Sequence, residues 1–114
     1  MAFKFNFVRN SILPEVIEIT PDSFQDLRGA MWTSFADEIL DNKLIDNRIC
    51  FKHDKFSHTK RGALRGLHGD EKSWKLVSCP FGKVFQVTVD ARVESSNYLK
   101  ATTTILSGDN KKMI

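Results

Sequence analysis

The sequence has few of the residues that cross-link a fold or anchor it in a membrane. Its 114 residues include two cysteines, Cys50 and Cys79, which match no zinc-ligand spacing and are expected to stay reduced. No apolar run approaches the roughly 18 residues that span a bilayer. The N-terminal segment MAFKFNFVRN also lacks the apolar stretch of a signal peptide. These absences predict a cytoplasmic protein with no membrane partner.

The composition is that of an ordinary globular domain. Hydrophobic residues make up 41% and charged residues 27% of the chain, which argues against disorder. A chain of this length has room for one modest core, so residues 1–114 are expected to form a single domain. The net charge of +3 is uneven, because residues 52–75 carry seven basic and three acidic side chains. This window favours a phosphate-bearing partner, although a solvated basic face is as common.

Alternation of apolar and polar residues predicts a mostly β chain. The clearest strand is expected over residues 83–93, where Phe85, Val87 and Val89 share one side. The one helix is expected over residues 34–43, because Ser34 and Asp37 form a capping-box pattern. Many short strands at regular spacing favour an all-β sandwich or jelly roll with one short helix. Further strands are expected at residues 3–8, 15–20, 31–35, 49–57, 64–68, 74–79 and 102–106.

The glycines around the segment LRGLHGDEKSWKLV have the spacing of the first cupin motif. Gly62, His68, Asp70, Lys75 and Gly82 are separated by five, one, four and six residues. In metal-binding cupins a second histidine and a glutamate occupy the positions of Asp70 and Lys75 and ligate a divalent ion. A lysine ammonium has no lone pair to donate to a metal, so this frame predicts a site without metal.

Several segments, in order, resemble the nucleotide-sugar 3,5-epimerase family, typified by dTDP-4-dehydrorhamnose 3,5-epimerase. The resemblance covers nearly the whole chain and implies a cupin-like jelly roll. It also implies a homodimer with exchanged N-terminal strands and a substrate that is a 4-keto-6-deoxy sugar on a nucleoside diphosphate. The segments are FQDLRG (24–29), LRGLH (64–68), KLV (75–77), GKVFQVTVDAR (82–92) and LSGDN (106–110).

The implied chemistry explains the residue types. A ketone at C4 acidifies the hydrogens on C3 and C5, so a base, an oxyanion stabiliser and an acid suffice without a cofactor. His68 resembles the family's base, because an imidazole accepts protons near neutrality. Lys75 resembles the cation beside the developing oxyanion. Arg28 and Arg65 resemble diphosphate contacts, since a guanidinium fork binds anions bidentately. The full set of expected substrate contacts is Phe24, Arg28, Thr33, His53, Lys55, Arg65 and Asp70.

Some positions depart from the thymidine-specific members of the family. Those members carry a glutamine and an asparagine where His53 and Lys55 stand, and a glutamate where Thr33 stands. Their LHYQ has become LHGDE at residues 67–71. Because these positions are expected to read the base, the resemblance points to a branch that epimerises GDP-linked 6-deoxy-4-keto-heptoses for capsule or lipopolysaccharide.

The family pattern also implies a missing part. Beyond LSGDNKKMI the family continues with a second cupin motif, which supplies a tyrosine acid and an aspartate paired with the histidine. The single tyrosine here, Tyr98, lies in SSNYLK and does not match the acid position. We therefore expect a C-terminally truncated fold with little or no epimerase activity alone, apart from residual proton exchange through His68. Unpaired strand edges should make it associate with itself or with a complementary fragment.

Two other functions remain open at this point. One is a non-catalytic cupin paralogue that binds a sugar nucleotide without turning it over. The other is a small basic β-barrel that binds nucleic acid by stacking bases on aromatics such as Phe51, Phe56 and Trp74. Nucleic-acid binding would depend steeply on salt, whereas the epimerase interpretation involves no nucleic acid.

Overall fold

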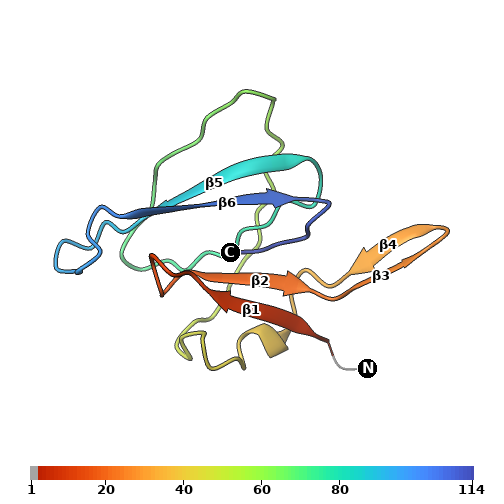
Figure 1. Ribbon diagram of the computed structural model, residues 1–114, viewed down its shortest axis with the longest axis horizontal. Coiled ribbons are helices and arrows are strands. Elements are labelled where there is room, and N and C mark those ends of the chain that lie inside the picture. The colour runs from red at the N-terminus through yellow and green to blue at the C-terminus, as the bar shows by residue number, and fades with distance from the viewer. Residues whose placement is uncertain (1–2) are drawn as a thin grey trace.

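In the computed structural model, which describes residues 3–114, the chain is built from three antiparallel hairpins (Figure 1). One turn of 3-10 helix, η1 (Asp37–Ile39), is the helical element of this described range. The all-β prediction is confirmed. The hairpins pair β1 (Phe5–Arg9) with β2 (Ile17–Pro21), β3 (Ser23–Asp26) with β4 (Gly29–Trp32), and β5 (Lys83–Val89) with β6 (Ala101–Ser107).

A small core lies against the β1–β2 hairpin. Alternation along β2 turns Ile17 and Ile19 inward, and both are buried with Ile39 and Met113. The N–H of Ile19 donates to the carbonyl of Met113 at 2.8 Å, and the N–H of Met113 donates back at 2.7 Å. The C-terminal residues are thereby held beside β2 (Figure 1). Partly buried side chains around this core are Phe5, Phe7, Leu44, Ile45 and Leu76.

The β5–β6 hairpin has one buried and one exposed face. Thr102, Thr104 and Leu106 of β6 are buried, whereas the residues between them are exposed. The register places Phe85 opposite Ile105, and these side chains are 68% and 50% exposed. β5 ends at Val89 rather than at the predicted residue 93, because the chain turns where the Asp90 carboxylate accepts nearby N–H groups.

Four predictions of secondary structure were wrong. Residues 49–57, 64–68 and 74–79 form no strand, apart from an isolated bridge between Ser78 and Met113. A period-two pattern makes a strand only when a neighbouring strand supplies hydrogen bonds. No strand of the described range pairs with these segments, and residues 74–79 gain only the bridge at Ser78 and two backbone bonds between Val77 and Ile114. The helix predicted over residues 34–43 is only η1. Its N-cap is Ala36, which is extended and offers no side-chain cap, so the Ser34 capping box does not form.

The strand predicted over residues 31–35 lies earlier and is part of a hairpin. β3 and β4 pair from Ser23 opposite Trp32 to Asp26 opposite Gly29. Gly29 has a φ of +132°, a value that glycine adopts readily at such a turn. The hairpin projects from the rest of the protein, and nearly all of its residues are exposed (Figure 1).

Candidate functional site

His68 and Lys75 lie in the irregular segment that runs from η1 to β5. Both side chains are exposed. Between them, Asp70 Oδ1 accepts the backbone N–H of Lys72 and the backbone N–H of Ser73, both at 2.7 Å. The two predicted catalytic side chains therefore flank one turn.

This turn is electrostatically favourable for a carboxylate. The hydrogen bond from the backbone N–H of Lys72 lowers the pKa of Asp70 most strongly, and hydrogen bonds from Ser73 lower it further. The positive charge of Lys75 contributes in the same direction. Asp70 is therefore ionised at neutral pH. It is a fixed negative charge within electrostatic reach of Lys75.

The backbone at Gly66 approaches the His68 side chain closely. A Cβ atom at Gly66 would stand 3.3 Å from His68 N and 3.4 Å from His68 Nδ1. Gly66 also has a φ of +100°, a conformation that L side chains rarely adopt. A side chain at this position would strain the backbone and would displace the imidazole by a few tenths of an ångström.

Three further predicted site residues lie on the same irregular segment. His53, Lys55 and Arg65 are exposed. Arg65 Nε donates to Thr59 Oγ1 at 3.0 Å, which ties the LRGLH motif to the loop before it. The basic side chains of residues 52–75 are thus on the surface, as a phosphate-binding site requires.

The remaining predicted contacts lie on or beside the projecting hairpin, away from His68. Phe24 of β3 faces Met31 of β4, and these side chains are 66% and 75% exposed. Arg28 forms an ion pair with Asp26, and its Nε donates to Asp26 Oδ2 at 3.0 Å. That pairing lowers the pKa of Asp26. The β3–β4 hairpin, which carries Phe24 and Arg28, projects away from the irregular segment that holds His68 (Figure 1).

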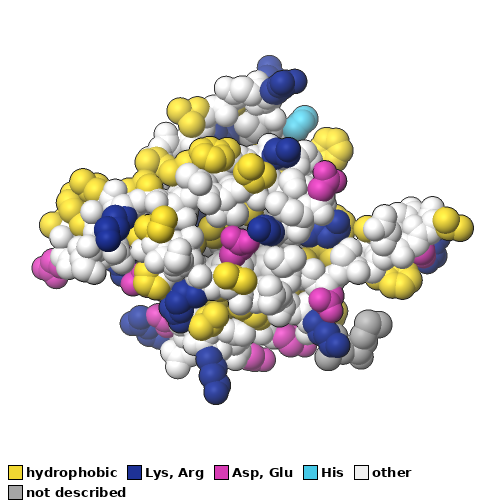
Figure 2. All heavy atoms as spheres, in the orientation of Figure 1, with side chains coloured by type: hydrophobic (Ala, Val, Ile, Leu, Met, Phe, Trp, Pro, Cys, Tyr) yellow, Lys and Arg dark blue, Asp and Glu magenta, His cyan; other side chains and the backbone are white. Residues whose placement is uncertain are grey.

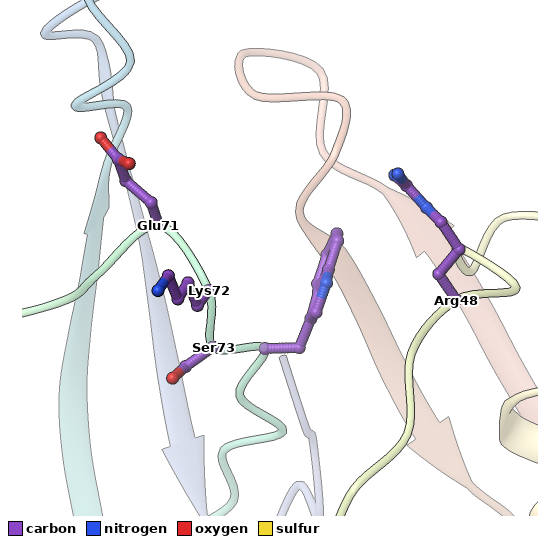
Figure 3. Close-up of a pocket in the computed structure, with 5 residues that line it drawn as sticks. Arg48, Glu71, Lys72 and Ser73 are labelled. Atoms are coloured by element: carbon purple, nitrogen blue, oxygen red, sulfur yellow. The ribbon is translucent and has the colours of Figure 1, made fainter.

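A shallow pocket of about 420 Å³ lies beside the Asp70 turn. Arg48 stands on the side opposite Glu71, Lys72 and Ser73 (Figure 3). Arg48 NH2 donates to Asp46 Oδ2 at 2.6 Å, and this side chain holds the pKa of Asp46 at about 2. Arg48 is not among the site residues predicted from the sequence, although its Asp-x-Arg spacing from Asp46 was a usable signal. Trp74 completes the pocket wall and is 51% exposed.

Neither a metal centre nor a membrane span is found in residues 3–114. No group of three or more His, Cys, Asp or Glu side chains there is placed to hold a metal ion. No helix in this range has the length and apolar character needed to cross a bilayer.

Comparison of the sequence with known proteins identifies relatives of this chain. The profile of the family described as dTDP-4-dehydrorhamnose 3,5-epimerase matches residues 10–114. The dTDP-4-dehydrorhamnose 3,5-epimerase of Salmonella typhimurium is 34% identical over 94% of this chain and 60% of its own length. The enzyme of that name from Escherichia coli K12 is also 34% identical, over 96% of this chain and 60% of its own length. The chain therefore spans about 60% of the length of these curated relatives.

Solved structures share the fold. The dTDP-6-deoxy-D-glucose-3,5-epimerase of Legionella pneumophila, in complex with dTDP-4-keto-L-rhamnose, matches with a TM-score of 0.82 and 34% identity, over 96% of this chain and 58% of its own. The Bacillus anthracis dTDP-4-dehydrorhamnose 3,5-epimerase matches with a TM-score of 0.83 over 96% of this chain and 63% of its own. It is 24% identical and supports the fold alone. The cupin-like prediction is confirmed. The chain belongs to the dTDP-4-dehydrorhamnose 3,5-epimerase family.

Proposed function

We propose that this protein serves as a sugar-nucleotide 3,5-epimerase, acting on a nucleoside-diphosphate 4-keto-6-deoxy sugar. The observation that carries the proposal is the placement of His68 and Lys75 on either side of one turn, in a chain of this family. The Legionella pneumophila relative was solved with a sugar of this class.

In the proposed reaction the His68 imidazole takes the proton from C3 or C5 of the sugar. The C–H electron pair moves toward the C4 ketone and leaves an enolate, whose oxygen carries the negative charge. The Lys75 ammonium stabilises that oxyanion, an effect that can contribute on the order of 10²–10³ in rate. Return of a proton to the opposite face of the carbon inverts it. No electrons leave the substrate, so the step needs no oxidant.

The acid that returns this proton comes from outside residues 1–114 in our proposal. Residues 1–114 then form the N-terminal portion of the family fold. The 60% coverage of the curated relatives supports this proposal. Tyr98 lies in the loop that links β5 and β6, 44% exposed, rather than on the segment of His68.

The β3–β4 hairpin fits an exchange between two subunits. It projects from its own chain with Phe24 and Met31 exposed (Figure 1). A homodimer that exchanges N-terminal strands would place Phe24, Arg28 and Thr33 at the His68 segment of the other subunit. The predicted substrate contacts would then come from two chains.

The finer proposal concerns the nucleotide. The relatives carry names that specify dTDP sugars. Here His53 and Lys55 replace the two amides of the thymidine-specific members, which favours a GDP-linked heptose of capsule or lipopolysaccharide synthesis. A site that hydrogen-bonds one base rejects another that leaves its polar groups unpaired. Competition binding with GDP and dTDP tests this proposal: we expect tighter GDP binding, and tighter dTDP binding would refute it.

The reaction itself is tested by incubating the protein in D2O with GDP- and dTDP-linked 4-keto-6-deoxy sugars. An epimerase incorporates solvent deuterium at C3 or C5. A sugar-nucleotide-binding paralogue binds without incorporation. A nucleic-acid binder, the alternative that the exposed basic residues 52–75 favour, instead binds oligonucleotides with a steep salt dependence.

A further inference from the structure

The Asp70 turn lies between the two side chains that the proposed reaction uses. His68 precedes Asp70 by two residues, and Lys75 follows Ser73 by two. Oδ1 of Asp70 accepts two consecutive N–H groups, those of Lys72 and Ser73, at 2.7 Å each. One carboxylate thus closes a turn over residues 70–73, between the proposed base and the proposed oxyanion stabiliser.

We propose that Asp70 is a positioning residue, whose carboxylate holds this turn and thereby sets where Lys75 stands relative to His68. The inference rests on the proposed function for the roles of His68 and Lys75. The claim that the Asp70 carboxylate holds the turn does not depend on any substrate. Asp70, predicted from the sequence to contact the substrate, acts in this proposal through its own chain.

Little else holds the segment in place. Residues 70–75 are exposed and belong to no β ladder, so neither core packing nor strand pairing orders them. A side-chain oxygen that accepts N–H groups two and three residues ahead is a recognised way to stabilise a turn. The bonds are charge-assisted, which makes each of them stronger than a bond between neutral groups.

The carboxylate is also in the right protonation state. The N–H of Lys72, followed by Ser73, lowers the pKa of Asp70. Asp70 therefore accepts both hydrogen bonds at neutral pH, where the imidazole of a histidine base works. Its charge contributes to the field at Lys75, and the test must separate that contribution from the effect of the turn.

Two substitutions separate geometry from charge. Asp70→Ala removes the acceptor, whereas Asp70→Asn keeps a side-chain oxygen at the same place and removes only the charge. Asp54→Ala is the matched control, because Asp54 is another exposed acid of the same irregular segment. The first readout is amide hydrogen exchange at Lys72 and Ser73, together with the side-chain ¹³Cε resonance of Lys75, measured by NMR on the full chain.

We expect Asp70→Ala to speed amide exchange at Lys72 and Ser73 about tenfold or more, the effect of losing a hydrogen bond to a charged acceptor. The Lys75 resonance should move as well. Asp54→Ala should leave exchange close to wild type. Asp70→Asn should speed it clearly less than Asp70→Ala does, because the amide oxygen still accepts but without the charge. Unchanged amide exchange in Asp70→Ala overturns the positioning role, and so does an Asp70→Asn variant that is as disturbed as Asp70→Ala.

Deuterium incorporation into a 4-keto sugar nucleotide supplies the second readout. Asp70→Ala should slow it by about 10²-fold, the cost of moving a catalytic group by roughly 1 Å, and Asp70→Asn should restore most of the rate. If the wild-type protein incorporates no deuterium, the proposed function fails, and the NMR measurement still decides the role of Asp70. Incorporation that is equally fast in wild type and Asp70→Ala contradicts the inference.

Discussion

Three Asp-x-Arg tripeptides adopt the same local structure in different parts of the chain. In each, the backbone N–H of the arginine donates to Oδ1 of the aspartate, at 2.8, 2.8 and 3.0 Å, and the guanidinium of the same arginine binds the same carboxylate. The interaction spans two residues, so it depends on spacing rather than on the fold. The pairs are Asp26 with Arg28, Asp46 with Arg48, and Asp90 with Arg92.

Burial separates the third pair from the others, and it predicts which pair stabilises the protein. The Asp90 side chain is 4% exposed, compared with 22% for Asp46. Asp90 also accepts the Ser95 hydroxyl at 2.6 Å, and Arg92 lies 3.3 Å from Glu15. We expect Asp90→Asn to lower the melting temperature in thermal unfolding. Asp46→Asn, the matched control, should leave it close to wild type, because exposed ion pairs contribute little. Equal melting temperatures for the two variants would contradict this.

The same carboxylate gives stability a pH dependence of known sign. Hydrogen bonds from the Arg92 guanidinium, and secondly from the Ser95 hydroxyl, hold the pKa of Asp90 well below its usual range. The folded state therefore favours the ionised form. Its stabilisation is complete above the unfolded-state pKa of about 3.9 and is lost as the pH falls toward the folded-state value. Below about pH 4 the wild-type melting temperature should fall more steeply than that of Asp90→Asn.

Gly66 provides a test of how the His68 ring is held. Gly66 and Gly62 both have positive φ, at +100° and +83°, but only at Gly66 would a Cβ meet His68. Both alanine variants should lose about 1 kcal/mol or more of unfolding free energy. Only Gly66→Ala should shift the ring resonances of His68 in NMR spectra. Equal shifts in the two variants would show that the close contact does not position the ring.

At the scale of elements, alternation predicted some strands and missed others for identifiable reasons. β2 was predicted correctly, and its side chains are alternately buried and half-buried. β5 was predicted from its alternating sequence, although its burial does not alternate; its pairing with β6 is what forms the strand. β3 was missed because its four residues are all exposed, so burial imposes no pattern on them. Residues 49–57, 64–68 and 74–79 alternate without a partner strand, and pairing is a property of the fold that the sequence of one segment does not contain.

The predicted site shows the same division. The cupin spacing identified His68, Asp70 and Lys75, and the structure places them around one turn because they are close in sequence. The hydrogen bonds of Asp70 could not be deduced from spacing alone. Phe24, Arg28 and Thr33 were grouped with His68 by resemblance. They lie on or beside the projecting hairpin. Whether they meet His68 depends on how whole chains are arranged, which the spacing of residues does not contain.

Two substitutions distinguish the core from the exposed face of β5–β6. Ile39 is 1% exposed, so Ile39→Ala should lower the unfolding free energy by about 2–5 kcal/mol. Phe85 is 68% exposed on the face that Ile105 shares, so in the dissociated chain Phe85→Ser should change that free energy by less than about 0.5 kcal/mol. Urea unfolding of both variants, at protein concentrations low enough to keep the chains dissociated, checks the contrast. A loss in Phe85→Ser as large as that in Ile39→Ala would show that this face is covered.

At the scale of the whole molecule, the chain is more open than a compact domain of its length. Its radius of gyration is 15.0 Å, whereas a compact chain of this size has about 13 Å. Large apolar side chains remain exposed over β5 and on the β3–β4 hairpin (Figure 2). Leu27, at the hairpin turn, and Phe81, before β5, are among the most exposed, at 106% and 94%.

This openness predicts association. Exposed apolar faces and unpaired strand edges recruit other chains. We expect sedimentation to show dimers or larger species, and Phe85→Ser to reduce them, because it removes an aromatic ring from the exposed face. A monodisperse monomer at micromolar concentration would contradict the expectation. It would also weaken the proposal that the site is shared between subunits.

Deuterium incorporation into the sugar, compared between His68→Ala and His58→Ala, shows whether His68 is the base of the proposed reaction. His58 is the matched control, an exposed histidine of the same irregular segment. The proposal predicts residual incorporation at C3 or C5 by the wild-type chain, kept in His58→Ala and reduced by about 10²–10⁴-fold in His68→Ala. No incorporation above the rate in buffer, or incorporation that survives in His68→Ala, would contradict the assignment of His68 as the base.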